Sequence, residues 1–269
     1  MIEHGTFTED CLRIHRQFPL VHNITNYVAM NLSANALLAI GASALMSSEP
    51  EEMSEIVTTC DALQINLGCL EKRQVEAMVV AARTANALGK PWVLDPVGVG
   101  ISRLRTETTR MLIARYNPVV IRGNASEIMF LAGADAIPRG VDATTESHLA
   151  VEHAVRLAKE TGAVVSVSGL VDYITDGTEI FSIFNGSPMM SQVSAMGCTA
   201  SAITAAFLAV DDIPLYAATN AMALMGIAGE RAAAESAGPG SLVANFIDLL
   251  AGLDPEEAAN SIRYEQISA

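Results

Sequence analysis

The residues best suited to chemistry lie at 195–202, where Gly197 and Cys198 precede a run of small side chains. This composition predicts the start of a helix that a ligand can approach closely. A helix N-terminus has unpaired N–H groups and a positive dipole end, which together bind anions such as a phosphate group in transfer. The same position lowers the pKa of a thiol, so Cys198 is a candidate to assist deprotonation of a hydroxyl. The alternative is an inert, buried cysteine in a packed helix. We favour the functional interpretation.

A second candidate site follows Arg122 and Gly123, at Asn124 to Glu127. The spacing favours a capping box, with Asn124 as the N-cap of a helix and Glu127 at its third position. The carboxylate of Glu127 is also a ligand type suited to hydrated Mg²⁺, which needs few carboxylates. Both roles are compatible, because a residue such as Asn124 at a helix N-terminus beside a crevice is well placed to face a triphosphate.

Asp95 ends an apolar run and precedes a turn that contains Gly98 and Gly100. The stretch is not a dinucleotide fingerprint, because the third glycine and an immediate helix are missing, and the chain has no ordinary P-loop sequence. Asp95 is therefore a candidate metal-site carboxylate, with a turn aspartate that bonds its own backbone as an equal alternative. Near the N-terminus, Thr25 or Asn26 reads as a helix N-cap, and Asn26 as a possible ligand contact.

Short apolar runs alternate with helical patterns along the first two thirds of the chain. This alternation predicts an α/β fold, in which a mainly parallel central sheet has helices on both faces. Ligands bind beyond the carboxyl ends of such strands. The residues that end the runs are Met46, Asn66, Asp95, Arg122 and Ser168. The expected strands are 43–46, 62–66, 92–95, 119–122 and 164–168, and the expected helices are 27–40, 51–60, 71–88, 103–115, 125–132 and 146–160.

The pattern changes after residue 172. A turn at Asp176 and Gly177 separates two apolar segments, 173–175 and 179–184, and predicts an antiparallel hairpin. The remaining chain predicts helices at 198–210, 214–236 and 241–252. No linker or repeat marks a boundary, so we expect one domain over 1–269.

The bulk composition narrows the class of partner. The chain has 269 residues, 51% of them hydrophobic, and a formal net charge of −14. Such a charge argues against nucleic acid or an anionic membrane as partner and leaves small molecules or other subunits. The cysteines have no Cys-x-x-Cys spacing, and no secretory signal or membrane-spanning segment is recognisable, so we expect a cytoplasmic protein. The histidines lack a His-Glu-x-x-His pair, which argues against zinc.

Six stretches of the chain form a recognisable combination: 21–26 (VHNITN), 37–43 (LLAIGAS), 94–97 (LDPV), 121–127 (IRGNASE), 172–177 (DYITDG) and the helix start at 197–198. The combined pattern resembles that of the hydroxyethylthiazole kinases, thiamine-salvage enzymes of the ribokinase-like group, over essentially the whole chain. This resemblance implies transfer of the ATP γ-phosphate to the hydroxyl of 4-methyl-5-(2-hydroxyethyl)thiazole, with Mg²⁺. It also implies a homotrimer with substrate pockets at the subunit interfaces.

The resemblance also implies roles for single residues. Arg122 and Ser168 correspond to nucleotide contacts, and Asp95 and Glu127 to magnesium-site carboxylates. The positions that correspond to the thiazole pocket are Met46, Ala195, Asn26 and Gly68, with Gly197 and Cys198 at the reaction centre.

The chain departs from the family in one loop. The family usually reads Gly-Thr-Gly-Cys where this chain has Ala195, Met196, Gly197 and Cys198. Glycine at the first position allows a positive φ and a close approach of phosphate. If Gly197 alone forms the anion-binding turn, we expect activity with altered efficiency. The alternatives are another ribokinase-like vitamin kinase, acting on a hydroxymethylpyrimidine or pyridoxal-type alcohol, and a nucleotide-binding protein that has lost catalysis.

Overall fold

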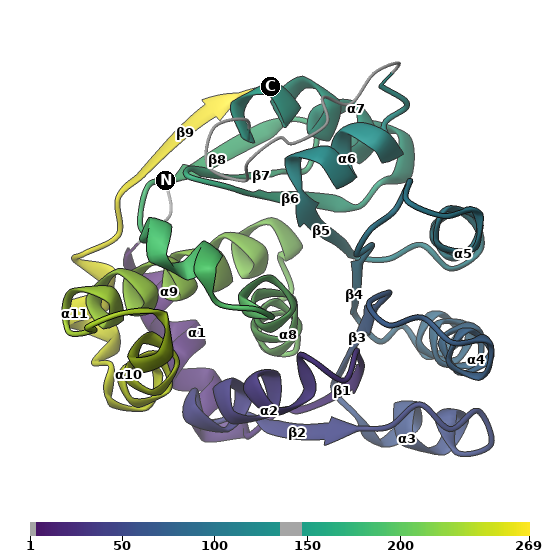
Figure 1. Ribbon diagram of the computed structural model, residues 1–269, viewed down its shortest axis with the longest axis horizontal. Coiled ribbons are helices and arrows are strands. Elements are labelled where there is room, and N and C mark those ends of the chain that lie inside the picture. Colours follow the sequence, from purple (N-terminus) through teal and green to yellow (C-terminus); the bar gives the residue numbers. More distant parts are fainter. Residues whose placement is uncertain (1–3, 135–146) are drawn as a thin grey trace.

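The computed structural model describes residues 4–134 and 147–269, and one sheet runs through them. Its strand order is β2-β1-β3-β4-β5-β6-β7-β8-β9 (Figure 1). Neighbours from β2 to β6 are parallel, whereas β7, β8 and β9 are added antiparallel. The strands are β1 Leu20–Ile24, β2 Ser43–Met46, β3 Ala62–Asn66, β4 Trp92–Asp95, β5 Val120–Asn124, β6 Val164–Ser168, β7 Asp172–Thr175, β8 Glu179–Ile183 and β9 Tyr264–Ser268.

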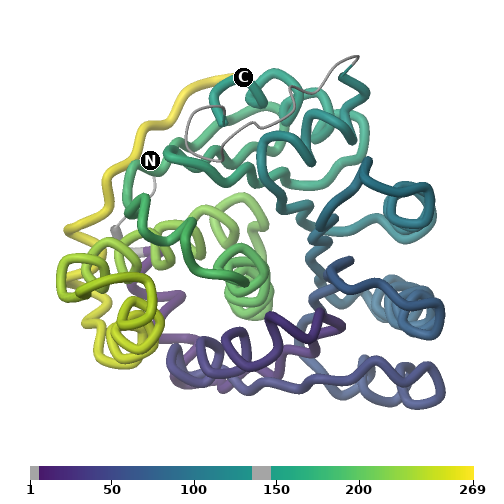
Figure 2. The backbone as a smooth tube through the Cα atoms, in the orientation of Figure 1, coloured from purple at the N-terminus to yellow at the C-terminus, as the bar shows by residue number. Residues whose placement is uncertain are grey.

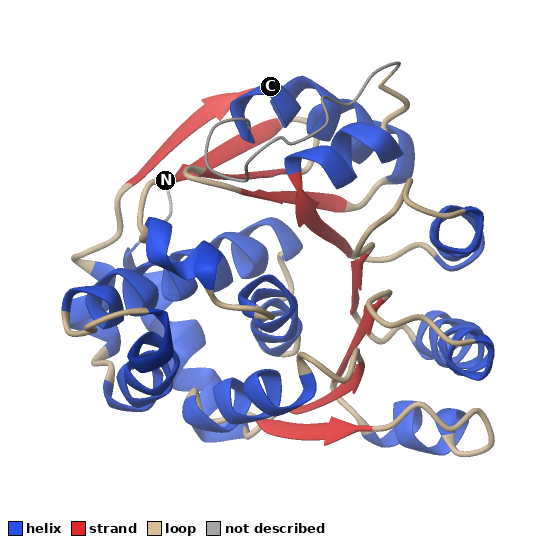
Figure 3. Ribbon diagram, in the orientation of Figure 1, coloured by secondary structure: helices blue, strands red, loops and turns tan. Residues whose placement is uncertain are grey.

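Helices cover both faces of this sheet, as the sequence predicted (Figure 3). One face packs against α2 Met30–Ala39, α8 Met196–Leu208 and α9 Pro214–Ala234. Behind these helices lie α1 His4–Gln17 and α10 Pro239–Gly252, with α11 Pro255–Ala259 beside α1. The other packs against α3 Met53–Thr59, α4 Lys72–Leu88, α5 Arg103–Tyr116, α6 Ala125–Leu131 and α7 Val151–Thr161, which follows the short 3₁₀ helix η1 Ser147–Ala150. None of the described helices is long and apolar enough to cross a membrane.

Four of the predicted strands have the observed bounds, and the predicted hairpin is β7 and β8. The strand expected at 119–122 instead begins at Val120 and continues to Asn124. The sequence did not predict β1, β9, α1 or α11. β9 returns along the outside of the molecule after α11 and pairs with β8 (Figure 2).

Two helices begin three or more residues later than predicted. α2 starts at Met30, three residues after the expected position, because Val28 and Ala29 first form a turn whose N–H groups donate to Asn26 Oδ1. Asn26 therefore caps this turn, and Thr25 has no capping role. The helix expected at 146–160 is divided between η1 and α7, and its first residue lies outside the described residues.

One face of the sheet is apolar near the start of the parallel strands and polar near their carboxyl ends. Side chains point to opposite sides of a strand in turn, so residues two apart share a face. The strand positions that pack toward α8 and α9 near the start of each strand are apolar: Val21, Ala62, Val93, Val120 and Val164. The next positions on the same face are Asn23, Gln64, Asp95, Arg122 and Ser166, all buried. The carboxyl half of this face is therefore a buried polar band beneath α8.

Candidate active site

The start of α8 lies over this polar band. The helix begins at Met196, so the predicted helix start at Gly197 and Cys198 is confirmed to within two residues. Its N-cap is Ala195, with a left-handed φ of 71°. A residue with a Cβ atom adopts this conformation at an energetic cost. The condition considered above, that Gly197 alone forms the turn, is not met, because the left-handed residue is Ala195 and Gly197 lies within the helix.

Arg122 extends from β5 toward the first turn of α8. Its side chain is buried, and a Cβ atom on Gly197 would overlap Nη1 of the guanidinium. The Nε atom of Arg122 has no hydrogen-bond partner among the described residues. A buried cation with an unused donor, placed against the N–H groups of a helix terminus, is an anion-binding arrangement.

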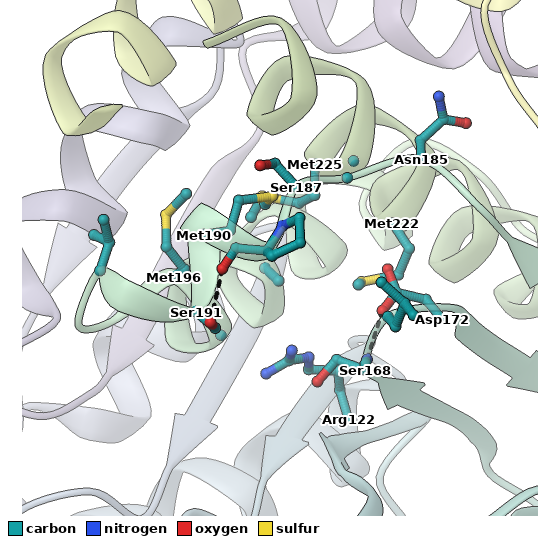
Figure 4. A pocket seen from close by; sticks show the side chains of 18 of the residues that line it. Arg122, Ser168, Asp172, Asn185, Ser187, Met190, Ser191, Met196, Met222 and Met225 are labelled. Atoms are coloured by element: carbon teal, nitrogen blue, oxygen red, sulfur yellow. Dashed lines mark hydrogen bonds between the residues drawn. The ribbon is translucent and has the colours of Figure 1, made fainter. Parts of the chain in front are cut away.

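A cavity of about 300 Å³ opens beside Arg122 (Figure 4). Of the predicted site residues, Arg122, Ser168, Ala195 and Gly197 line it. The opposite wall was not predicted, and it comes from α9 and from the 3₁₀ helix η2 Pro188–Gln192. This wall includes three methionines, which are adaptable apolar side chains: Met190, Met222 and Met225. Met196, the first residue of α8, adds a fourth methionine to the cavity lining.

Asp172 is a charged residue of the cavity wall that our sequence reasoning did not select as a site residue. It begins β7, and its Oδ1 atom accepts a hydrogen bond of 2.9 Å from the Gly169 N–H. Burial raises the pKa of this carboxyl to about 7, although the hydrogen bond and the charge of Arg122 oppose the shift. The only sequence signal was its place at the head of the motif 172–177.

Asp95 lies on the same sheet face as Arg122 and is fully buried. Its Oδ2 atom accepts hydrogen bonds from Asn66 Nδ2 at 2.6 Å and from Ser201 Oγ at 2.8 Å. Burial raises the pKa of Asp95, and the nearby Arg122 charge lowers it. Among the described residues, both of these bonds use Oδ2, which leaves Oδ1 for another ligand.

Glu127 forms the predicted capping box with Asn124. Asn124 Oδ1 accepts from the Glu127 N–H, and Glu127 Oε2 accepts from the Asn124 N–H, both at 2.9 Å. Glu127 Oε1 also accepts from the Gly98 N–H at 2.9 Å. Burial and then the charge of Asp95 raise the pKa of Glu127 to about 6. Two carboxylates that repel one another in this way are suited to share a divalent cation.

The thiol of Cys198 has the opposite electrostatic character from the one expected. Burial raises its pKa to about 11, with a further increase from Asp95, and these effects outweigh the hydrogen bonds from Asn26 and Asn66, which lower it. The prediction of a lowered thiol pKa is therefore wrong, and at neutral pH Cys198 is a neutral S–H group. Its sulfur accepts a hydrogen bond of 3.4 Å from Asn26 Nδ2, and its backbone carbonyl accepts one of 2.9 Å from Gln64 Nε2.

Beyond Cys198, the remaining polar contacts come together at Asn66. Asn26 Nδ2 and the Gly68 N–H both donate to Asn66 Oδ1 at 2.9 Å. Gly68 packs so closely on Asn26 that a Cβ atom there would overlap the amide. The structure thus brings Asn26, Gly68, Cys198 and Asp95 together around Asn66, and none of these four residues lines the cavity.

Residues 12–256 match the model of the Hydroxyethylthiazole kinase family. The chain belongs to this family. A family relative, a hydroxyethylthiazole kinase of Brachyspira hyodysenteriae, is 50% identical over 245 residues, which cover 91% of this chain and 92% of the relative. Another, from Leptospira biflexa, is 48% identical over 248 residues, or 92% and 93% of the two chains.

Solved structures agree with this family assignment. The hydroxyethylthiazole kinase from Pyrococcus horikoshii superposes with a TM-score of 0.90 at 37% identity, over 98% of this chain and 99% of that one. The pyridoxal kinase of Staphylococcus aureus, solved with AMP-PCP and pyridoxal, shares the fold at a TM-score of 0.59 and 16% identity, over 79% and 88% of the chains. The expected family and fold are both confirmed.

Met46, one of the predicted substrate-site residues, does not line the cavity. Met46 ends β2, the edge strand of the sheet, and is the register partner of Asn23 on β1. It is half-buried and is not part of the cavity lining in the described chain. Pairing with β1 connects Met46 to the other residues, because Asn26 lies two residues after the end of β1.

Proposed function

We propose that this chain transfers the γ-phosphate of ATP to the hydroxyl of 4-methyl-5-(2-hydroxyethyl)thiazole in thiamine salvage. The observation that carries the proposal is the first turn of α8. Arg122 and the cavity lie on one side of that turn, and Cys198 with Asn26 lies on the other. A phosphate at the helix terminus would therefore have a nucleotide side and an acceptor side. Family membership supports the identity of the acceptor.

The nucleotide side would bind ATP through positive charge and backbone N–H groups. Arg122 would neutralise phosphate charge, and Ser168 and Asn124 would supply polar contacts from the ends of β6 and β5. The N–H groups at 196–198 would hold the transferring group. Phosphoryl transfer depends chiefly on such positioning and electrostatic stabilisation.

Asp95 and Glu127 fit a magnesium site and would hold the ion. Burial and then repulsion by Asp95 raise the pKa of Glu127, and Mg²⁺ takes one or two carboxylates together with phosphate and water oxygens. The bound ion would supply charge neutralisation between the nucleotide phosphates. Glu127 also keeps its capping role, since each of its oxygens accepts one backbone N–H and has a second lone pair free.

The acceptor side would orient the alcohol. Because its pKa is about 11, Cys198 acts as a neutral hydrogen-bonding group that aligns the hydroxyl oxygen with the phosphate. Asn26, Gly68, Ala195 and Met46 would form the thiazole pocket. A loose transition state asks little of a base, so alignment by a neutral thiol is sufficient.

We further infer a homotrimer of single-domain subunits with the thiazole pocket at the interface. β2 leaves its outer edge unpaired within the described chain, and Tyr27 and Val28 are 67% and 59% exposed next to Asn26. Unpaired edges and exposed apolar side chains favour association. All four cysteines are free thiols, which fits work in a reducing cytoplasm.

The deciding experiment is mass spectrometry of the products after incubation of purified protein with MgATP and the thiazole alcohol. We expect the thiazole phosphate, and much slower phosphorylation of hydroxymethylpyrimidine and pyridoxal in parallel assays. Folded protein that binds ATP without forming any product would overturn the proposal in favour of lost catalysis. Preference for a different alcohol would indicate another vitamin kinase.

A further inference from the structure

Asn66 joins the two sides of the site through one side-chain amide. It ends β3 and is completely buried. Its Oδ1 atom accepts from Asn26 Nδ2 and from the Gly68 N–H, both at 2.9 Å. Its Nδ2 atom donates to Asp95 Oδ2 at 2.6 Å. The Asn66 side chain also interacts with the Cys198 thiol and lowers the pKa of that thiol. No other described side chain contacts Asn26, Asp95 and Cys198 together through hydrogen bonds.

These partners allow only one orientation of the amide. A flipped Asn66 would place its NH₂ group against two donors, Asn26 Nδ2 and the Gly68 N–H. It would also turn its oxygen toward the carboxylate of Asp95. Both changes leave buried polar groups unpaired or opposed, which is costly in a low-dielectric interior. The amide is therefore a fixed link between a carboxylate and a second amide.

We propose that Asn66 is a positioning residue that holds the phosphate side and the alcohol side of the site in one fixed relation. Its nitrogen orients Asp95 and so the free Oδ1 atom, and its oxygen orients Asn26, which in turn contacts Cys198. This inference rests on the proposed kinase function. Asn66 orients groups on both sides of the site, whereas each neighbouring polar residue contacts only one side.

Two neighbouring residues, Ser201 and Asn26, each contact only one of the two sides that Asn66 joins. Ser201 donates to the same Asp95 Oδ2 atom at 2.8 Å, but within the described chain it forms no hydrogen bond with Asn26. Asn26 contacts Cys198 and Asn66 but not Asp95. Ser201→Ala should therefore affect the phosphate side alone, and Asn26→Ala the alcohol side alone.

The test compares the steady-state kinetics of Asn66→Ala with these two variants. We expect Asn66→Ala to lower kcat by about 100-fold, the scale of a misplacement near 1 Å. It should also raise both the KM for the thiazole and the Mg²⁺ concentration for half-maximal rate. Ser201→Ala should raise only the Mg²⁺ requirement, and Asn26→Ala only the thiazole KM. A change in one parameter alone for Asn66→Ala, or in neither, would overturn the proposal.

A matched control removes a comparable buried amide elsewhere. Asn220 in α9 is also completely buried and donates to a carboxylate, Asp10 Oδ2, at 2.8 Å. Asn220→Ala should leave the thiazole KM and the Mg²⁺ requirement unchanged. If Asn66→Ala does not fold, Asn66→Asp preserves the shape and the acceptor oxygen for Asn26. It should keep the thiazole KM near the wild-type value while kcat falls, and an unchanged kcat would overturn the proposal.

A readout independent of turnover separates this inference from the proposed function. Peptide mass spectrometry can follow alkylation of Cys198 by iodoacetamide at one fixed pH. Asn66→Ala should change that rate several-fold, because both Asn66 and Asn26 contact the thiol, whereas Ser201→Ala should not. If the wild-type protein forms no thiazole phosphate, the kinase proposal is overturned. The alkylation rates of Cys198 would still test whether Asn66 positions the thiol. Equal rates in wild type and Asn66→Ala would overturn the link itself.

Discussion

A Cβ atom on Gly197 would lie 2.7 Å from Nη1 of Arg122, closer than real Cβ contacts. The guanidinium thus occupies the space that any larger residue at 197 would need. Nη1 is the end of a flexible side chain, so a methyl group would displace the arginine while the backbone of α8 stays in place. Glycine is needed at 197 because the Arg122 guanidinium lies against it, and the backbone there has an ordinary helical conformation.

Gly197→Ala is therefore expected to weaken ATP binding by about 10-fold to 100-fold, which corresponds to the ~1.5–3 kcal/mol of a hydrogen bond to a charged group. Stability should change little, since alanine favours the helix. Isothermal titration calorimetry with ATP and denaturant unfolding measure the two effects. Gly238→Ala is the control, because Gly238 has an extended φ of 171° and open space around it. Unchanged ATP affinity in Gly197→Ala would contradict this account of Arg122.

Ala195→Gly should stabilise the protein. Ala195 has a φ of 71°, and an L-residue in this region loses about 1–2 kcal/mol that glycine does not. We expect an increase of about 1 kcal/mol in the free energy of unfolding, measured by denaturant titration. The control is Ala209→Gly at the other end of α8, where φ is −73° and glycine should instead destabilise by roughly 0.5–1 kcal/mol. A loss of stability in both variants would show that Ala195 is not strained.

The buried carboxyl of Asp172 predicts a pH-dependent stability. Its pKa is raised from 3.8 to about 7, so between these values the folded protein holds a proton that the unfolded chain has released. The contribution is fully present below pH ~4 and is lost as pH rises through ~7, by at most about 1.4 kcal/mol per pH unit. Asp172→Asn keeps the Oδ1 acceptor and removes the titratable carboxyl, and with it the pH-dependent contribution to stability. The variant should therefore gain stability relative to wild type as pH rises from 4.5 to 8 in denaturant unfolding.

Asp176→Asn is the matched control for this pH series. The Asp176 carboxylate accepts hydrogen bonds from the Thr178 and Glu179 N–H groups, and its pKa is lowered. Its stabilisation is present above pH ~4 and is lost only as pH falls through the lowered pKa. The difference between Asp176→Asn and wild type should stay flat from pH 4.5 to 8. A flat difference for Asp172→Asn as well would mean that Asp172 is already ionised in the folded protein.

The neutral thiol of Cys198 leads to a prediction about catalysis. Cys198→Ala should lower kcat by about 10-fold to 100-fold with unchanged ATP affinity, because alignment of the alcohol is lost. Cys198→Ser retains a neutral hydroxyl and should keep most of kcat. Cys69→Ala changes an exposed cysteine and serves as control. A serine variant as slow as the alanine variant, with a wild-type rate that titrates with a thiol, would instead indicate a thiolate base.

Most of the central sheet could be predicted because its strands are short, mainly apolar segments between helical patterns. The strand at 62–66 is buried along its whole length, and only single polar residues interrupt its apolar residues. β1 is buried except at its first residue, but two adjacent polar residues, His22 and Asn23, interrupt its apolar run, so it was not predicted as a strand. β9 is largely exposed at the sheet edge and has no apolar signal. Its pairing with β8 depends on long-range contact, which local sequence does not encode.

The candidate site was predictable where strand ends and helix starts supply it. Asp95, Arg122 and Glu127 followed from those positions. The methionine wall did not, because Met190 and Met222 reach the cavity only through the packing of η2 and α9. The pKa of Cys198 was mispredicted for a related reason. A helix terminus is a local feature, whereas burial under neighbouring elements is a property of the whole fold, and burial had the larger effect.

The alternation that places Asp95 and Arg122 on one face makes strand length more critical than strand composition. Insertion of one residue into β4 ahead of Asp95 would rotate the carboxylate into the apolar layer of α4 and α5. An insertion of two would restore the face but move Asp95 along the strand, away from Asn66. Changes of chain length in this enzyme should therefore be confined to loops, while conservative exchange of Val93 or Leu94 within the strand is tolerated. Within a strand, a functional side chain keeps its face of the sheet only when the chain length before it changes by an even number of residues.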